Sequence, residues 1–337
     1  MMTKKVLISG ASVAGPALAC LLHRDGYDVT VVERTAEPRD SGYAVDFRGA
    51  AMRGTVLVDE RGAETGRLPS EAFAGELEVP KRELTRILHR ITSGTVEYVF
   101  GDSIRAISQH ESGVTVRFER GATREFDLVF GADGLHSRVR RLAFGPHEGA
   151  PRHLGLSGVG FSTANYLGLD HAGLLQHLSD TAIYLFSAGD ADRLTVSLSF
   201  ATSSPALDRR GRDEQEQAVR AAFAGHGWQA PRLLTAMSQA DDFYFSSACQ
   251  VRLDRWSRGR IALVGDAGYC AAPTSGMGTS QALAGAATLA RDLALADGDH
   301  TAAFSAYEAE LRPYVAQNQA RGRQTAATFG SRDDPAG

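Results

Sequence analysis

The pattern of apolar and polar residues is clearest near the N-terminus. Residues 6–8 form a short apolar run that predicts a buried strand, and residues 16–23 carry apolar side chains at helical spacing. A turn of small residues separates these two segments. A second apolar run at 29–32 predicts another buried strand and ends on Glu33. This order of strand, glycine turn, helix, strand and acid is typical of a dinucleotide-binding βαβ unit.

The turn of this unit has residues suited to a pyrophosphate. Gly10 permits a tight turn, Gly15 permits close packing of helix on strand, and free N–H groups at the helix start carry partial positive charge. Ser12 replaces the middle glycine of the fingerprint, so its Cβ narrows the gap to a phosphate, whereas Glu33 can bond a ribose diol. The alternative is an ordinary βαβ crossover with a small-residue turn. The predicted nucleotide-binding residues are Gly10, Ser12, Val13, Ala14, Gly15, Glu33 and Arg34.

The segment from residue 52 to residue 130 alternates over short distances, which predicts strands. Residues 52–68 indicate a hairpin with its turn at 59–62, and a helix follows from Pro80. Leu84, Ile87, Leu88 and Ile91 recur along that helix at helical spacing. Further strands are expected at 96–100, 104–108, 114–118 and 126–130. We expect these to form a small antiparallel meander that feeds back into the parallel sheet.

The pattern changes between about residues 151 and 250. Alternation at 181–187 and 194–201 predicts an antiparallel sheet, and 213–224 predicts an amphipathic helix. Beyond this region, residues 259–266 predict another buried strand, which ends on Gly265 and Asp266. Two helices then follow, at 279–295 and 302–324.

These elements predict an α/β fold with two domains. The first is a Rossmann-like nucleotide-binding domain with a mixed, mainly parallel sheet, made of residues 1–150 and 250–330. The second, at 151–249, is built on an antiparallel sheet and faces the substrate. The hairpin at 52–79 can belong to either domain.

Composition narrows the class of protein. Of 337 residues, 43% are hydrophobic and 23% are charged, which is ordinary for a globular enzyme. The net charge of −4 gives no basis for binding nucleic acid or acidic lipid. The three cysteines, Cys20, Cys249 and Cys270, lack metal-like spacing and indicate a reducing, cytoplasmic environment. We expect no membrane span, because no apolar stretch approaches the required length, and no bound metal.

Three stretches far apart in the sequence form one pattern. They are the turn at 10–15 with Glu33, Asp133–Gly134 at a strand end, and Gly265–Asp266 followed by the loop at 267–278. In this combination the chain resembles the single-component FAD-dependent aromatic hydroxylases, which have the fold of p-hydroxybenzoate hydroxylase. Within that family it is most similar to the bacterial branch of tetracycline-inactivating and polyketide-tailoring monooxygenases. The resemblance covers residues 5–50, 78–145 and 245–320.

The resemblance implies an FAD site with NAD(P)H as reductant. It places Asp133 near the flavin pyrophosphate or ribityl chain, Arg48 toward the flavin, and Lys81 where the family usually has an arginine. A carboxylate at a strand end, such as Asp266, can accept from a ribityl hydroxyl, although a helix-capping role is the alternative. The glycines after it let N–H groups at the next helix start approach the flavin ring. The residues expected here are Arg48, Lys81, Asp133, Gly265, Asp266, Pro273, Gly276, Gly278 and Thr279.

The implied activity is hydroxylation of an aromatic or polyketide-like small molecule with O₂, through a flavin C4a-hydroperoxide. No catalytic acid or base is assigned, and the expected assembly is a monomer or homodimer. Only Ala50 and Ala51 separate Gly49 from the hairpin, where the family has a longer segment that walls the flavin. An FAD-dependent oxidoreductase or cyclase that does not hydroxylate is therefore one alternative, and a flavin-free ligand-binding descendant is another.

Overall fold

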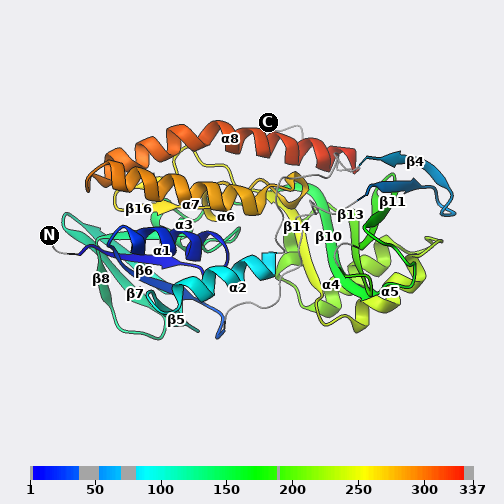
Figure 1. Ribbon diagram of the computed structural model, residues 1–337, viewed down its shortest axis with the longest axis horizontal. Helices are drawn as coiled ribbons and strands as arrows, with labels where there is room; N and C mark the ends of the chain where they lie inside the picture. Colours follow the sequence, from blue (N-terminus) through cyan, green and yellow to red (C-terminus); the bar gives the residue numbers. More distant parts are fainter. Residues whose placement is uncertain (1–2, 38–52, 70–80, 188–189, 330–337) are drawn as a thin grey trace. The chain divides into compact units, whose positions relative to one another are not determined.

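The computed structural model of the protein describes residues 3–37, 53–69, 81–187 and 190–329 (Figure 1). The chain divides into two compact units. Unit 1 comprises the described residues of 1–40, 81–152 and 249–321, and unit 2 comprises those of 41–80, 153–248 and 322–337. In the described part of the chain, no helix has the length and apolar character needed to cross a bilayer.

Unit 1 is built on a six-stranded sheet with the strand order β15-β16-β9-β1-β2-β5. All neighbouring strands are parallel except β15 and β16. In this order the strands are Ser257–Arg258, Ile261–Leu263, Leu128–Gly131, Lys5–Ser9, Asp28–Glu33 and Glu97–Phe100. This is the mainly parallel sheet that the sequence predicts, so the α/β fold class is confirmed.

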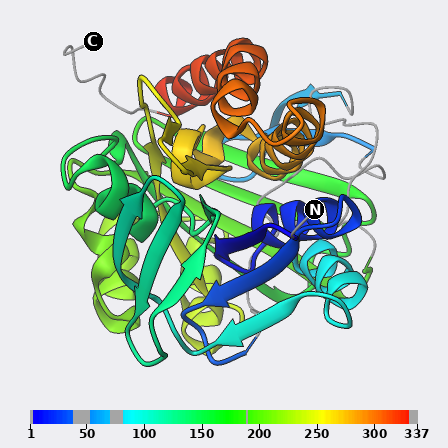
Figure 2. The same ribbon diagram turned by 90° about the vertical axis from the view of Figure 1, so that its left-hand side faces the viewer.

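Alternation along β1 explains how the unit 1 sheet is covered on both faces. Val6 and Ile8 belong to one apolar cluster and Leu7 belongs to another, because successive side chains of a strand point to opposite faces. Helices α1, α2, α7 and α8 contribute to the first cluster, while α3 and the sheet β6-β7-β8 contribute to the second (Figure 2). These helices are Ala14–Arg24, Lys81–Thr92, Gly278–Leu295, His300–Thr328 and Arg138–Phe144. The strands β6, β7 and β8 are Ile104–His110, Gly113–Phe118 and Arg124–Phe126.

Unit 2 contains a seven-stranded sheet in the order β14-β10-β13-β12-β11-β3-β4. Here β3 pairs with β11 in parallel. The pairs β10–β13, β13–β12, β12–β11 and β3–β4 are antiparallel. Helices α4 (Arg212–Ala222) and α5 (Ala230–Gln239) share an apolar cluster with one face of this sheet. In this order the strands are Tyr244–Gln250, Arg152–Ala164, Arg193–Ala201, Thr181–Ser187, Ala172–Leu178, Thr55–Val58 and Glu64–Leu68. Unit 2 also contains the short helical turn η2 (Pro205–Arg209), whereas the short turns α6 (Asp266–Tyr269) and η3 (Pro273–Ser275) belong to unit 1.

Two sequence predictions about unit 1 are wrong. The strand expected at 96–100 is β5, which pairs with β2 in the parallel sheet and not with the meander. The strand expected at 126–130 is two strands, because Asp127 interrupts it: its N–H donates to Lys5 O at 2.7 Å and its carboxylate accepts from Lys5 N at 2.7 Å. Along α2, Leu88 is buried but Ile87 and Ile91 are exposed.

Glycine at position 285 lets α7 pack closely on α6. A Cβ at Gly285 would lie 1.9 Å from the Tyr269 hydroxyl, which shares a 2.8 Å hydrogen bond with the Tyr307 hydroxyl. Gly285→Ala should therefore lower the free energy of unfolding by about 1–2 kcal/mol, since overpacking outweighs the gain in helix propensity. Denaturant titration measures this change. Gly94→Ala is the control, because a Cβ there meets nothing within 4 Å; equal stability of the two variants would contradict the prediction.

Candidate functional site

The three predicted stretches meet at one edge of the unit 1 sheet. Gly10, Ala132 and Val264 each donate a backbone hydrogen bond of 2.8 Å to the neighbouring strand, respectively β2, β1 and β9. These bonds continue the parallel ladder one residue beyond the strands, so the three turns start side by side. The carboxyl edge of a parallel sheet is where α/β proteins of this type bind their ligands.

Close packing excludes a side chain at Gly10 and Gly15 of this edge, and a positive φ disfavours one at Gly265. Gly10 has a φ of +110°, and a Cβ there would lie 2.4 Å from a carbonyl oxygen that follows β9. A Cβ at Gly15 would lie 1.9 Å from the Gly10 carbonyl oxygen. Gly265 has a φ of +65°, and its Cβ would meet Ala14 of α1 and Ala282 of α7 at 3.3 and 3.5 Å. The starts of α1 and α7 thus approach the same turn.

Both of these helices begin without a side-chain cap. Val13 precedes α1 and Met277 precedes α7, and in the described structure neither helix start receives a side-chain cap hydrogen bond. Ser12 therefore does not cap α1. Uncapped first-turn N–H groups keep their partial positive charge available to an anion. Gly276, with a φ of +62°, turns the chain just before α7.

Glu33 is oriented by the turn that follows β1. Its Oε2 accepts from Ala11 N at 3.0 Å, and its Oε1 accepts from the N–H and the hydroxyl of Thr35 at 3.1 and 3.3 Å. A carboxylate has about four lone-pair sites, so capacity remains for a further donor. The side chain is partly exposed, as a ligand-binding acid at this edge must be, and Arg34 beside it is exposed.

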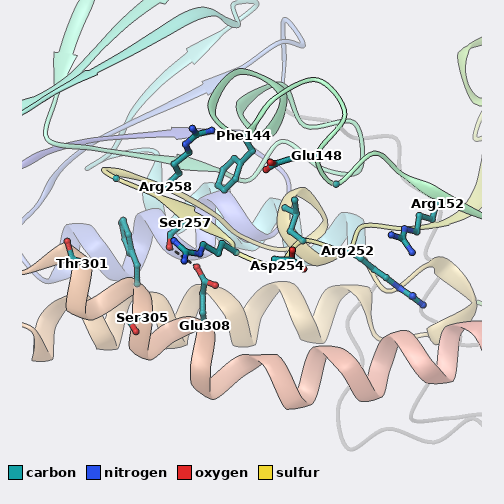
Figure 3. Close-up of a pocket in the computed structure, with 15 residues that line it drawn as sticks. Phe144, Glu148, Arg152, Arg252, Asp254, Ser257, Arg258, Thr301, Ser305 and Glu308 are labelled. Carbon is teal, nitrogen blue, oxygen red and sulfur yellow. Dashed lines mark hydrogen bonds between the residues drawn. The ribbon is translucent and has the colours of Figure 1, made fainter. Parts of the chain in front are cut away.

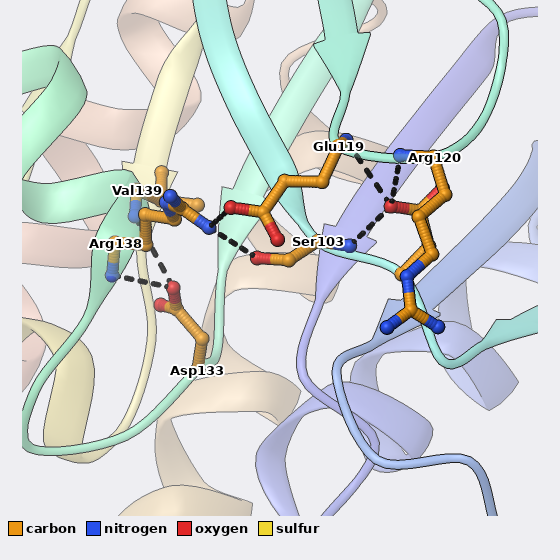
Figure 4. A network of polar contacts seen from close by, with 7 residues as sticks. Ser103, Glu119, Arg120, Asp133, Arg138 and Val139 are labelled. Carbon is orange, nitrogen blue, oxygen red and sulfur yellow. Dashed lines mark hydrogen bonds and ion pairs between the residues drawn. The ribbon is translucent and has the colours of Figure 1, made fainter.

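Asp133 helps to cap the N-terminus of α3, whose N-cap residue is Ser137. The Asp133 carboxylate accepts from the Ser137 hydroxyl. It also accepts from Arg138 N at 2.7 Å and from Val139 N at 3.1 Å (Figure 4). Removal from water raises the pKa of the Asp133 carboxyl despite these donors. The described contacts therefore give Asp133 a helix-capping role, which its position at a strand end did not predict.

A polar network extends from this cap into the three-stranded sheet (Figure 4). The Arg138 guanidinium donates to Ser103 Oγ at 3.1 Å and to the Glu119 carboxylate. Asp102 in turn accepts from the backbone N–H groups of Ser103, Glu119, Arg120 and Gly121. These contacts fix the loop after β9 from the side opposite to α1.

Arg140 links the second stretch to the third. Its guanidinium is 2% exposed and donates to Ala267 O and Leu135 O, each at 2.7 Å. Burial lowers the pKa of the Arg140 guanidinium. Arg140 thereby joins the loop after β9 to helix α6, a role that sequence spacing did not reveal.

Asp266 starts the third stretch. It is the first residue of α6, and Gly265 occupies the N-cap position before it. The ribityl-binding role and the helix-cap role of Asp266 therefore both stay predictions. The carboxyl group is partly exposed. Burial and the neighbouring Asp266 carboxylate raise the pKa of the Cys270 thiol, which therefore stays protonated.

The loop between α6 and α7 contains a strained residue. Ala272 has φ +73° and ψ 152°, a region adopted almost only by glycine, and it is 3% exposed. Such a conformation costs about 1–3 kcal/mol and persists only where the surroundings enforce it. It directly precedes Pro273, one of the predicted cofactor residues.

Two predicted residues are not placed in this arrangement. Arg48 lies outside the described residues. Lys81 is the first residue of α2, and its side chain also lies outside the described part. Their expected contacts with the flavin stay predictions. Thr279 lies in the first turn of α7, next to Gly278.

A separate hollow of about 920 Å³ lies in unit 1 before the amino end of β16 (Figure 3). Its lining is mainly polar or charged and includes Glu148, Arg258 and Glu308. Glu308 is already engaged, because it accepts from Ser257 Oγ at 2.6 Å and from Arg312 at 2.9 Å. Among the described residues, no predicted cofactor residue lines this hollow, which is at the opposite end of β16 from Gly265.

Comparison with known proteins identifies the family. Residues 75–322 match the family model described as "FAD binding domain", and the chain belongs to this family. A flavin-dependent monooxygenase of Legionella longbeachae is 35% identical, over 98% of this chain and 90% of that protein. An uncharacterized protein of Mycobacterium tuberculosis is 40% identical, over 94% of this chain and 92% of that protein.

The protein is an FAD-dependent monooxygenase. Among solved structures it is similar to the tetracycline destructase Tet(55), with a TM-score of 0.85, 36% identity, and coverage of 97% of this chain and 90% of that chain. The HpxO protein of Klebsiella pneumoniae, solved with FAD and uric acid, has a TM-score of 0.80 at 21% identity, which shows the shared fold. Its coverage is 98% of this chain and 90% of that chain.

The capping role of Asp133 has a measurable consequence for stability. Asp133→Ala leaves three partly buried donors, the Ser137 hydroxyl and the N–H groups of Arg138 and Val139, without this acceptor. The free energy of unfolding of the apoprotein should therefore fall by about 1–3 kcal/mol. Denaturant titration followed by circular dichroism measures this. The exposed Asp241 provides the control, Asp241→Ala, which should change stability by less than about 0.5 kcal/mol. Unchanged stability of Asp133→Ala would contradict the capping role.

Proposed function

We propose that the carboxyl edge of the unit 1 sheet holds FAD, and that unit 2 carries the substrate-binding surface. In this proposal unit 1 is the FAD-binding domain and the enzyme works in the cytoplasm as a monomer or homodimer. The observation that carries it is the set of glycine positions that packing keeps free of side chains beside two uncapped helix starts. A pyrophosphate needs such close approach to backbone N–H groups.

Each part of the site has a proposed role toward the cofactor. The segment 10–15 and the start of α1 would hold the pyrophosphate, and Glu33 would accept from the ribose hydroxyls. Asp266 would accept from a ribityl hydroxyl. The start of α7, at Gly278 and Thr279, would place partial positive charge at the flavin ring and favour its anionic reduced form. These roles fit the geometry, since Gly265 joins the starts of α1 and α7.

The proposed reaction is hydroxylation of an aromatic or polyketide-like small molecule with NAD(P)H and O₂. When bound, FAD supplies the redox chemistry that couples NAD(P)H oxidation to oxygen activation. The chain itself binds and orients the cofactor and excludes water from it. The substrate class is supported by the similarity to tetracycline destructases at 34% and 36% identity.

The role of Glu33 is testable by cofactor affinity. Glu33→Gln removes the charge from an acceptor, so we expect FAD affinity to fall by about ten- to a hundredfold, corresponding to a lost charge-assisted hydrogen bond. Flavin fluorescence titration of the apoprotein measures the affinity. Glu37→Gln is the matched control, because Glu37 is exposed and follows β2 by only a few residues. Equal FAD affinity in the two variants would refute the assignment.

The reaction is tested by comparing product formed with NAD(P)H consumed. The FAD-loaded enzyme would be supplied with NADH or NADPH, O₂ and tetracycline as the probe. Because only Ala50 and Ala51 separate Gly49 from the hairpin, we expect water to reach the flavin, so most electrons should appear as hydrogen peroxide. A ratio of hydroxylated product to NAD(P)H near one would contradict this leakage. NAD(P)H oxidation without hydroxylated product for any aromatic probe would favour a non-hydroxylating oxidoreductase.

A further inference from the structure

Four buried side-chain amides surround the loop that follows α6. They come from three different elements, the end of β14, the first turn of α7 and the middle of α8. They are 0%, 1%, 4% and 9% exposed. We refer to them as the amide clasp, whose members are Gln250, Gln281, Asn318 and Gln319.

The amide clasp binds three consecutive backbone carbonyls. Gln281 Nε2 donates to Tyr269 O at 2.8 Å, and Gln250 Nε2 donates to Ala271 O at 3.1 Å. Gln319 Nε2 lies 3.3 Å from Cys270 O and 3.4 Å from Tyr269 O, and donates to the Val251 carbonyl at 2.8 Å. The carbonyls of residues 269–271 are therefore bonded by side chains from β14, α7 and α8.

The members of the clasp also orient one another. Asn318 Nδ2 donates to Gln281 Oε1 at 3.0 Å, which leaves the amide nitrogen of Gln281 directed at the Tyr269 carbonyl. Gln250 Nε2 also donates to Gln319 O, at 2.7 Å. Helix α8 is thus connected through Gln281 to the start of α7 and to the loop.

This loop is the one that contains strain. Ala272, with its φ of +73°, directly follows the last carbonyl held by the clasp. In a trans peptide the C=O and N–H groups point in opposite directions, so fixing the carbonyls of 269–271 also fixes the N–H directions of 270–272. The chain can remain in the strained conformation because these bonds are lost if it relaxes.

Burying a side-chain amide costs desolvation free energy unless the amide is hydrogen-bonded. An apolar side chain of similar size packs without needing partners, whereas each buried amide requires them. Here the partners are carbonyls of the segment that joins Asp266 to Pro273. The bonds therefore specify the path of that segment, which apolar packing alone would leave less defined.

We propose that Gln281, Asn318 and Gln319 are positioning residues for FAD, which act by holding the loop from Asp266 to Gly278 in its strained, binding-competent path. This inference rests on the cofactor site proposed above. In this proposal, buried residues of α8 affect the affinity for FAD without contacting the cofactor.

The test compares two glutamines on the same helix. Gln319→Met keeps the length of the side chain and removes its donor, so FAD affinity should fall by about tenfold or more as the loop leaves its path. Gln317→Met is the matched control, because Gln317 is exposed two residues away and should bind FAD as the native protein does. FAD affinity is titrated by flavin fluorescence, and thermal unfolding of each apoprotein is recorded separately.

A second arm separates positioning from stability. Ala272→Gly removes the strain, so this variant alone should bind FAD within about threefold of the native protein. In the Gln319→Met background the same change should restore much of the lost FAD affinity, because glycine adopts the required conformation without support. A merely structural role for Gln319 would lower the melting temperature but give no such rescue.

The outcomes distinguish the inference from the site on which it rests. If Gln319→Met melts at a lower temperature but binds FAD as tightly as Gln317→Met, the positioning role is wrong. If Asp266→Ala weakens FAD binding while Gln319→Met and Gln281→Met do not, the cofactor site stands and only the inference fails. If all of these variants bind FAD like the native protein, the cofactor site itself is misplaced.

Discussion

The absence of space for a Cβ at the carboxyl edge of the unit 1 sheet is the constraint on which the site depends. Gly10, Gly15 and Gly265 lie where backbone or helix atoms approach within 1.9–3.3 Å of the position that a Cβ would take. This closeness brings the starts of α1 and α7 to a common turn with their N–H groups uncapped. A turn of this kind is suited to an anionic cofactor, because uncapped N–H groups at a helix start carry partial positive charge.

Side chains that bond to the backbone hold the loops around this edge. Asp133 caps α3, Arg140 joins two loops through their carbonyls, and the amide clasp holds the chain at 269–271. All are polar groups withdrawn from water, which is favourable only when each is hydrogen-bonded. The loops are thus defined by directional bonds, and the strained Ala272 can be maintained.

The chain belongs to the FAD binding domain family, and we therefore relate the turns and helix starts of unit 1 to FAD. In a flavin-dependent monooxygenase the cofactor provides the redox chemistry, so the chain must mainly bind, orient and shield it. Unit 1 contains the glycine turns and the uncapped helix starts that the proposal above assigns to FAD. Unit 2, with its antiparallel sheet and helices α4 and α5 on one face, is a separately packed unit with its own apolar cluster.

The sequence by itself determined the β1–α1–β2 unit, the glycine turns and Glu33, because strand and helix periods and glycine positions are local signals. It also indicated the helices α7 and α8 almost to their ends. Only the tertiary structure decided that β5 joins the parallel sheet, since pairing partners depend on contacts far apart in the chain. The same holds for Asp133, Arg140 and the amide clasp. A glutamine in a helix has the same local pattern whether it meets water or a distant carbonyl, and only folding determines which of the two it meets.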